Sequence, residues 1–150
     1  MTGAVPLARY SPWTRRGDFI FLSGVIAVDA AAGRIVRGFP DLPAGVPETI
    51  GATGEFSADF KDGPILAQSW YVLDRIRATL EDAGGGMSDV FKLVQYFTDL
   101  DQFPRYNAVR RLFFPEAPPV STVVEVSGLM PSRAILIEVE ATAWLPHPRR

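Results

Sequence analysis

Glu138, a carboxylate near the end of the chain, is a residue that could do chemistry. Glu138 and Glu140 stand two positions apart in a run rich in Ile and Val, so a strand would carry both on one face. Such a carboxylate either activates water or holds a polar ligand, or it satisfies a backbone or interface partner. The chain has no cysteine, which excludes thiolate chemistry. Its single histidine, His147, lies between two prolines near the C-terminus, where we expect it to be solvated.

The amino-acid composition indicates a globular protein and disfavours some other classes of protein. A chain of 150 residues with 47% hydrophobic and 21% charged residues is typical of one globular domain, here residues 1–150. A net charge of −2 and the lack of a basic stripe disfavour nucleic-acid binding. No apolar run approaches the roughly 18 residues of a membrane span. The start of the chain does not resemble a signal peptide, so we expect a cytoplasmic protein.

The residues around these acids predict alternating strands and helices. We expect one helix over 64–82, with Pro64 in its first turn, and a second from Asp99 or Asp101 to Phe113. This order predicts an α+β fold, a mixed sheet with two helices covering one face. Strands are expected over 18–23, 26–28, 34–36, 91–98, 121–126 and 133–145.

Residues 38–63 have a different composition from their neighbours. They are rich in glycine and proline and show no hydrophobic period. We expect a long loop there, either a tolerated surface insertion or a lid over a pocket.

The last predicted strand indicates how the uncovered face of the sheet is used. Ile135, Ile137 and Val139 form an apolar face, while Glu138 and Trp144 lie on the opposite one. A surface that mixes acids with large apolar side chains suits a polar-lined subunit interface better than water. A solvated sheet on an isolated domain is the alternative.

Several strings, taken in order and spacing, resemble the RidA/YjgF family. The resemblance covers nearly the whole chain except residues 38–63 and the C-terminal tail. Its strings include Tyr10-Ser11-Pro12, Phe21-Leu22-Ser23-Gly24, Leu80-Glu81-Asp82-Ala83-Gly84, Phe97-Thr98-Asp99-Leu100, Val124-Glu125-Val126 and Ile137-Glu138-Val139-Glu140-Ala141.

This resemblance implies a fold and an activity. The fold is chorismate-mutase-like, and three copies form a homotrimer whose sheets line a central barrel. Small molecules bind in clefts between subunits. Members with deaminase activity hydrolyse enamines and imines such as 2-aminoacrylate and need neither a metal nor an organic cofactor.

The resemblance also implies which residues form the site. Glu138 is expected to manage the proton of the attacking water. Tyr10 could instead simply pack at an interface, and Ser23 and Asn107 could be hydrogen bonders that support the fold. The expected substrate-binding residues are Tyr10, Ser23, Asn107, Ser121 and Val123.

One position departs from the family pattern. Typical deaminases carry an arginine where this chain has Ser121. A neutral hydroxyl cannot replace a bidentate guanidinium, so we expect little activity towards 2-aminoacrylate. Arg105, Arg110 and Arg111 are predicted on a solvated helix face, although any of them, or Arg37, could replace the missing cation.

Two functions remain open on the sequence. The first is a divergent hydrolase or deaminase that acts on a small enamine, imine or related unsaturated metabolite. The second is a non-catalytic trimer that binds a small metabolite. A role in translation or RNA cleavage is disfavoured by the negative net charge.

Overall fold

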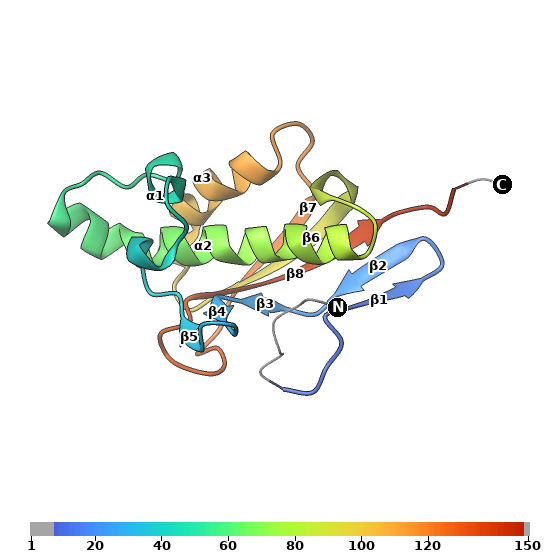
Figure 1. The fold of residues 1–150 in the computed structure, drawn as a ribbon, viewed down its shortest axis with the longest axis horizontal. Helices are drawn as coiled ribbons and strands as arrows, with labels where there is room; N and C mark the ends of the chain where they lie inside the picture. The colour runs from blue at the N-terminus through green and yellow to red at the C-terminus, as the bar shows by residue number, and fades with distance from the viewer. Residues whose placement is uncertain (1–7, 149–150) are drawn as a thin grey trace.

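The main sheet joins strands out of sequence order. The computed structural model describes residues 8–148 (Figure 1). The strand order is β1-β2-β8-β6-β7, with β3 also paired to β8. β6 and β7 run parallel, and the other neighbours are antiparallel. The strands are β1 Trp13–Arg16, β2 Phe19–Leu22, β3 Val25–Ile26, β6 Val90–Phe97, β7 Val120–Glu125 and β8 Ile137–Trp144, and a separate hairpin pairs β4 Val28–Asp29 with β5 Arg34–Ile35.

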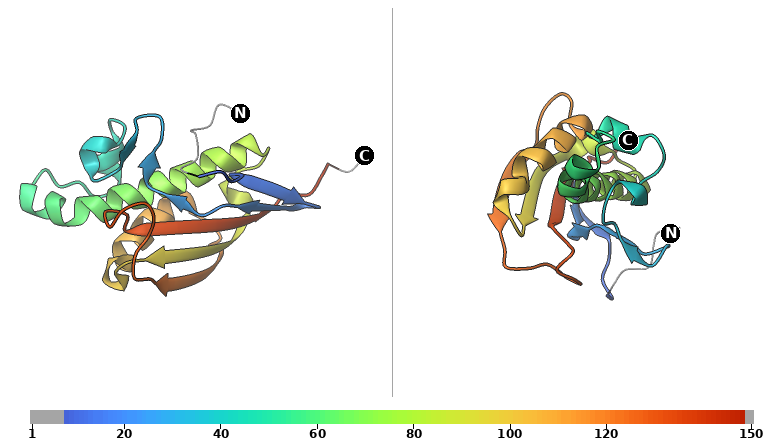
Figure 2. Two further views of the ribbon diagram at one scale, coloured as in Figure 1. Left: turned by 90° about the horizontal axis from the view of Figure 1, so that it is seen from below. Right: turned by 90° about the vertical axis from the view of Figure 1, so that its left-hand side faces the viewer.

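Two helices cover one face of this sheet. α2 (Phe56–Asp82) and α3 (Phe103–Phe113) pack on the same side and leave the other side bare (Figure 2). α3 forms the crossover between the parallel strands β6 and β7. The predicted α+β fold is thereby confirmed. Shorter helical segments are α1 (Val46–Thr49) and three 3-10 turns, Phe39–Asp41, Met87–Asp89 and Leu100–Gln102.

The last strand is shorter than the sequence predicts. β8 begins at Ile137 rather than at Arg133. The buried side chain of Gln68 on α2 intervenes, because its Nε2 donates to the Ala134 carbonyl at 2.7 Å. Its Oε1 accepts from the Leu136 N–H at 2.9 Å. These bonds occupy backbone groups that a longer strand would pair.

The first long helix begins at Phe56, so the prediction of a start at Pro64 was wrong. Asp59 organises the preceding turn, because its carboxylate accepts from the backbone N–H groups of Thr53 and Gly54 at 2.9 and 3.0 Å. The expected loop over residues 38–63 is accordingly much shorter and partly helical. Its Phe39 and Ile50 side chains belong to the hydrophobic core, so this segment is packed against the domain.

The bare face of the sheet carries large apolar side chains. Phe19 is registered with Trp144 across β2 and β8, and Phe91 lies edge-on to Phe19 at 5.9 Å between ring centres. Phe19 and Trp144 remain 43% and 52% exposed. These exposed rings therefore lie together on the face of the sheet that the helices leave uncovered.

Candidate functional site

A buried glutamine on β6 organises a group of polar side chains between β7 and α3. The Nε2 of Gln95 donates to Oγ of Ser121 at 2.8 Å and to the Thr122 carbonyl at 3.0 Å. Its Oε1 accepts from the Tyr106 hydroxyl at 2.6 Å. Burial raises the pKa of Tyr106, which keeps the phenol protonated as a donor. Gln95 itself has no exposed surface, and these bonds satisfy its amide.

Arg110 completes this group from α3. Its Nη1 donates to Oε1 of Gln95 at 2.8 Å and to Oγ of Ser121 at 3.0 Å, and its Nη2 donates to Oδ1 of Asn107 at 2.9 Å. The guanidinium carbon lies 5.6 Å from the ring centre of Phe103. The predicted solvated position of Arg110 was therefore wrong, because two aromatic rings and the buried acceptor Gln95 hold its side chain against β7. Gln95, Tyr106, Asn107, Arg110 and Ser121 form the arginine cluster.

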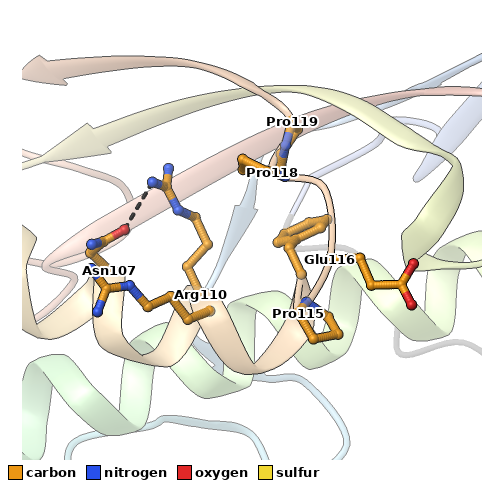
Figure 3. Close-up of a pocket in the computed structure, with 8 residues that line it drawn as sticks. Asn107, Arg110, Pro115, Glu116, Pro118 and Pro119 are labelled. Atoms are coloured by element: carbon orange, nitrogen blue, oxygen red, sulfur yellow. Dashed lines mark hydrogen bonds between the residues drawn. The ribbon is translucent and has the colours of Figure 1, made fainter.

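An open cavity of about 400 Å³ lies beside the arginine cluster. Asn107 and Arg110 line it from α3, and the segment that leads to β7 closes the opposite side (Figure 3). Arg111 and Glu116 also contribute charged side chains to its wall. The cavity is large enough for a small metabolite.

Glu138 lies on the bare face of the sheet, on β8. A β-carbon at Gly24 would overlap its Oε1 and lie 3.0 Å from its Cδ, so the carboxyl group occupies the space above this glycine. Burial, and then the neighbouring charge of Glu140, raise the pKa of Glu138. Among residues 8–148, no group donates a hydrogen bond to this carboxylate, whereas Glu140 accepts one from the Tyr96 hydroxyl at 3.1 Å.

The strand end beside Gly24 fixes the other residues expected on this side. Ser23 donates from Oγ to the Ser11 carbonyl at 2.6 Å, and its N–H donates to the Pro12 carbonyl at 3.0 Å. Ser23 therefore ties the segment before β1 to the end of β2. Tyr10, the residue before Ser11, is 45% exposed and available for contact. Glu138, Gly24 and the adjacent Ser23 form the glutamate group.

A single copy of the chain does not bring the two groups together. Gln95 is registered with Val139 on β8 and with Val123 on β7, which places Ser121 and Val123 on the helix-covered face. Glu138 is registered with Tyr96 and projects from the opposite face. Asn107 and Ser121 thus meet in the arginine cluster, with the half-buried Val123 beside it, while Glu138 lies across the sheet.

Comparisons with known proteins agree with this architecture. The model of a family described as Endoribonuclease L-PSP matches residues 46–145. A RutC family protein of Pyrococcus horikoshii is 34% identical over 139 residues, which cover 93% of this chain and 89% of that protein. This chain belongs to the RidA/YjgF family.

Solved structures of the RidA/YjgF family share the fold. A Klebsiella pneumoniae protein is 64% identical, with a TM-score of 0.90 over 91% of this chain and 100% of that one. RidA from an Antarctic Psychrobacter is 23% identical, with a TM-score of 0.72 over 95% of this chain and 93% of that one.

A protein named as a deaminase is also similar in sequence. This 3-aminoacrylate deaminase, RutC of Acinetobacter baylyi, is 27% identical over 138 residues, which cover 92% of this chain and 88% of that protein.

The RidA/YjgF pattern did not predict the contact between Arg110 and Ser121. The pattern leads us to expect a cation at position 121, and the structure holds Arg110 of α3 against the serine found there. The available signals were the spacing of Asn107 and Arg110, which puts them on one face of a helix, and a glutamine in an apolar strand. Arg105 is instead paired with Asp62 at 2.7 Å, and Arg37 and Arg111 are exposed.

Residues 8–148 contain neither a metal-binding cluster nor a membrane-spanning helix. Within the described residues, no three acidic or histidine side chains gather closely enough to hold a metal ion. Over that same range, no helix has both the length and the apolar character that crossing a bilayer requires.

Proposed function

We propose that this protein hydrolyses a small enamine, imine or related unsaturated metabolite, with Glu138 as the general base. The observation that carries the proposal is the state of the Glu138 carboxyl group. It is half-buried over Gly24, its pKa is raised, and no described group donates to it. A carboxylate with free acceptor positions and a raised pKa is suited to take a proton from water.

The reaction balances without any further reagent. The oxygen of water bonds to the imine carbon while Glu138 accepts one proton. Glu138 returns that proton to the nitrogen, which gives a carbinolamine. The hydroxyl proton of the carbinolamine then also passes to the nitrogen while the carbon–nitrogen bond breaks, so that ammonia or an amine leaves and a carbonyl compound remains. The deaminase named among the relatives, RutC of Acinetobacter baylyi, supports this class of chemistry.

We place the reaction in pockets between the subunits of a homotrimer. Glu138 and the arginine cluster lie on opposite faces of one sheet, so a neighbouring copy is needed to bring a carboxylate to the cluster. The exposed Phe19 and Trp144 support burial of the bare face by another copy. Light scattering during gel filtration should give three times the mass of the chain, and a monomer would contradict the shared pocket.

We expect the substrate to differ from 2-aminoacrylate. The cation beside Ser121 is carried by α3 rather than by β7, and three of its donors are already bound within the arginine cluster. A very short acid held from that side would be poorly placed for attack, and small misplacements cost much of the rate.

The test compares a panel of enamines and imines with wild-type protein and the Glu138→Gln variant. Removal of a general base should lower kcat by about 10²- to 10⁴-fold. The matched control is Glu48→Gln, which neutralises an exposed acid on α1 and should leave kcat unchanged. If wild-type protein accelerates no member of the panel while still binding a small ligand, the protein is a metabolite-binding module instead.

A further inference from the structure

The arginine cluster holds a guanidinium in one orientation at the wall of a cavity. The amide of Gln95 cannot turn over, because its Nε2 faces the Thr122 carbonyl and its Oε1 faces two donors, Tyr106 and Arg110. Arg110 also lies against the aromatic rings of Phe103 and Tyr106 at 5.6 and 5.7 Å. A cation fixed in this way loses little conformational entropy when it binds a ligand.

The unused hydrogen-bonding capacity of this cluster consists of donors. A guanidinium has five N–H groups, and Arg110 uses three of them on Gln95, Ser121 and Asn107. The other two meet no acceptor among residues 8–148. Oγ of Ser121 accepts from both Gln95 and Arg110, so both of its lone pairs are occupied and its O–H can only donate.

The charge of Arg110 is also not neutralised by a neighbouring acid. Arg77 and Arg105 form ion pairs with acidic side chains at 2.7–2.8 Å. Over the described part of the chain, no carboxylate lies within 4.0 Å of the Arg110 guanidinium, although Glu116 lines the same cavity. Free donors and an unpaired positive charge side by side are complementary to an oxyanion.

We propose that Arg110 and the Ser121 hydroxyl bind the carboxylate of a small organic acid. The donors offered to this planar anion are the two free N–H groups of Arg110 and the O–H group of Ser121, with Gln95 and Asn107 as positioning residues. This inference rests on the proposed function for one point, which is that the bound acid is the substrate or product of the hydrolysis. The binding step itself needs no turnover.

The test titrates pyruvate, and separately its neutral methyl ester, into the isotope-labelled full-length protein and follows the amide signals. Wild-type protein should bind pyruvate roughly tenfold more tightly than the ester, and Arg110→Gln should remove that difference. The matched control is Arg37→Gln, which changes the charge by the same amount at an exposed position that does not line the cavity. It should stay within about twofold of wild type. Equal binding of the acid and the ester by wild type, no binding of either, or unchanged pyruvate binding by Arg110→Gln would overturn the inference.

Two further variants separate loss of the carboxylate site from misfolding and from failure of the hydrolase proposal. If Arg110→Gln does not fold, Arg110→Lys retains the charge but loses the fork. It should weaken pyruvate binding by about threefold or more, and wild-type affinity would overturn the proposal. Glu138→Gln should keep pyruvate binding while it loses hydrolysis. Loss of turnover in Glu138→Gln together with unchanged pyruvate binding in Arg110→Gln would leave the hydrolase proposal standing and remove only the carboxylate site.

Discussion

The arginine cluster and the glutamate group lie on opposite faces of one sheet and differ in how completely their central polar side chains are hydrogen-bonded. In the arginine cluster every polar atom of the buried Gln95 amide is bonded, and each partner is itself held in place. Glu138 is half-buried without a donor from the described residues and carries a raised pKa. Saturated hydrogen bonding fixes a geometry, whereas an unsatisfied carboxylate retains the capacity to accept a proton. The cluster is therefore suited to positioning a ligand, and the glutamate to reacting with it.

The largest effect should come from a substitution of Gln95, at the centre of the arginine cluster, and should appear in the free energy of unfolding. Gln95→Leu would leave the Tyr106 hydroxyl and the Arg110 guanidinium without their shared acceptor in a buried site. We expect the free energy of unfolding to fall by about 2–4 kcal/mol, measured by denaturant titration at a fixed protein concentration.

Tyr106→Phe is the matched control for that substitution. It removes a single hydrogen bond and should reduce the free energy of unfolding by only about 1 kcal/mol. If Gln95→Leu is no more destabilising than Tyr106→Phe, the Gln95 amide is not the fully bonded centre of the cluster that the comparison requires.

A smaller effect, confined to catalysis, should come from Gly24. Alanine is conformationally acceptable there, but its β-carbon would overlap Oε1 of Glu138 and force the carboxyl group to move. We expect Gly24→Ala to lower kcat by roughly tenfold while the protein remains folded, because reacting groups must be accurately placed. Gly86→Ala meets nothing within 4 Å and should leave kcat unchanged. Equal kcat values for the two variants would show that the position of Glu138 above Gly24 does not matter.

The two groups also differ in how far the sequence predicts them. Alternation along the last strand correctly places Glu138 and Trp144 opposite the core, because side-chain direction in a strand has a fixed period. The contact between Arg110 and Ser121 joins a helix to a parallel strand and depends on the rotamer of a long side chain. Local pattern does not encode either feature. The early start of α2 was missed for a related reason, since Pro64 is typical of a first turn whereas tertiary packing extends this helix to Phe56.

The smallest expected effect concerns the acid limb of the pH–rate profile. Burial raises the pKa of Glu138 most, and the charge of Glu140 raises it further. Glu140→Gln removes the second cause and should lower that pKa without returning it to the ordinary range of glutamate. A general base must be ionised, so activity should persist to lower pH in this variant, while kcat near neutral pH changes little. Glu125→Gln, a neutralisation on β7 at the opposite side of the sheet, should leave the limb in place. A limb that moves to higher pH in Glu140→Gln, or that moves equally in both variants, would mean that the carboxylate titrating in catalysis is not Glu138.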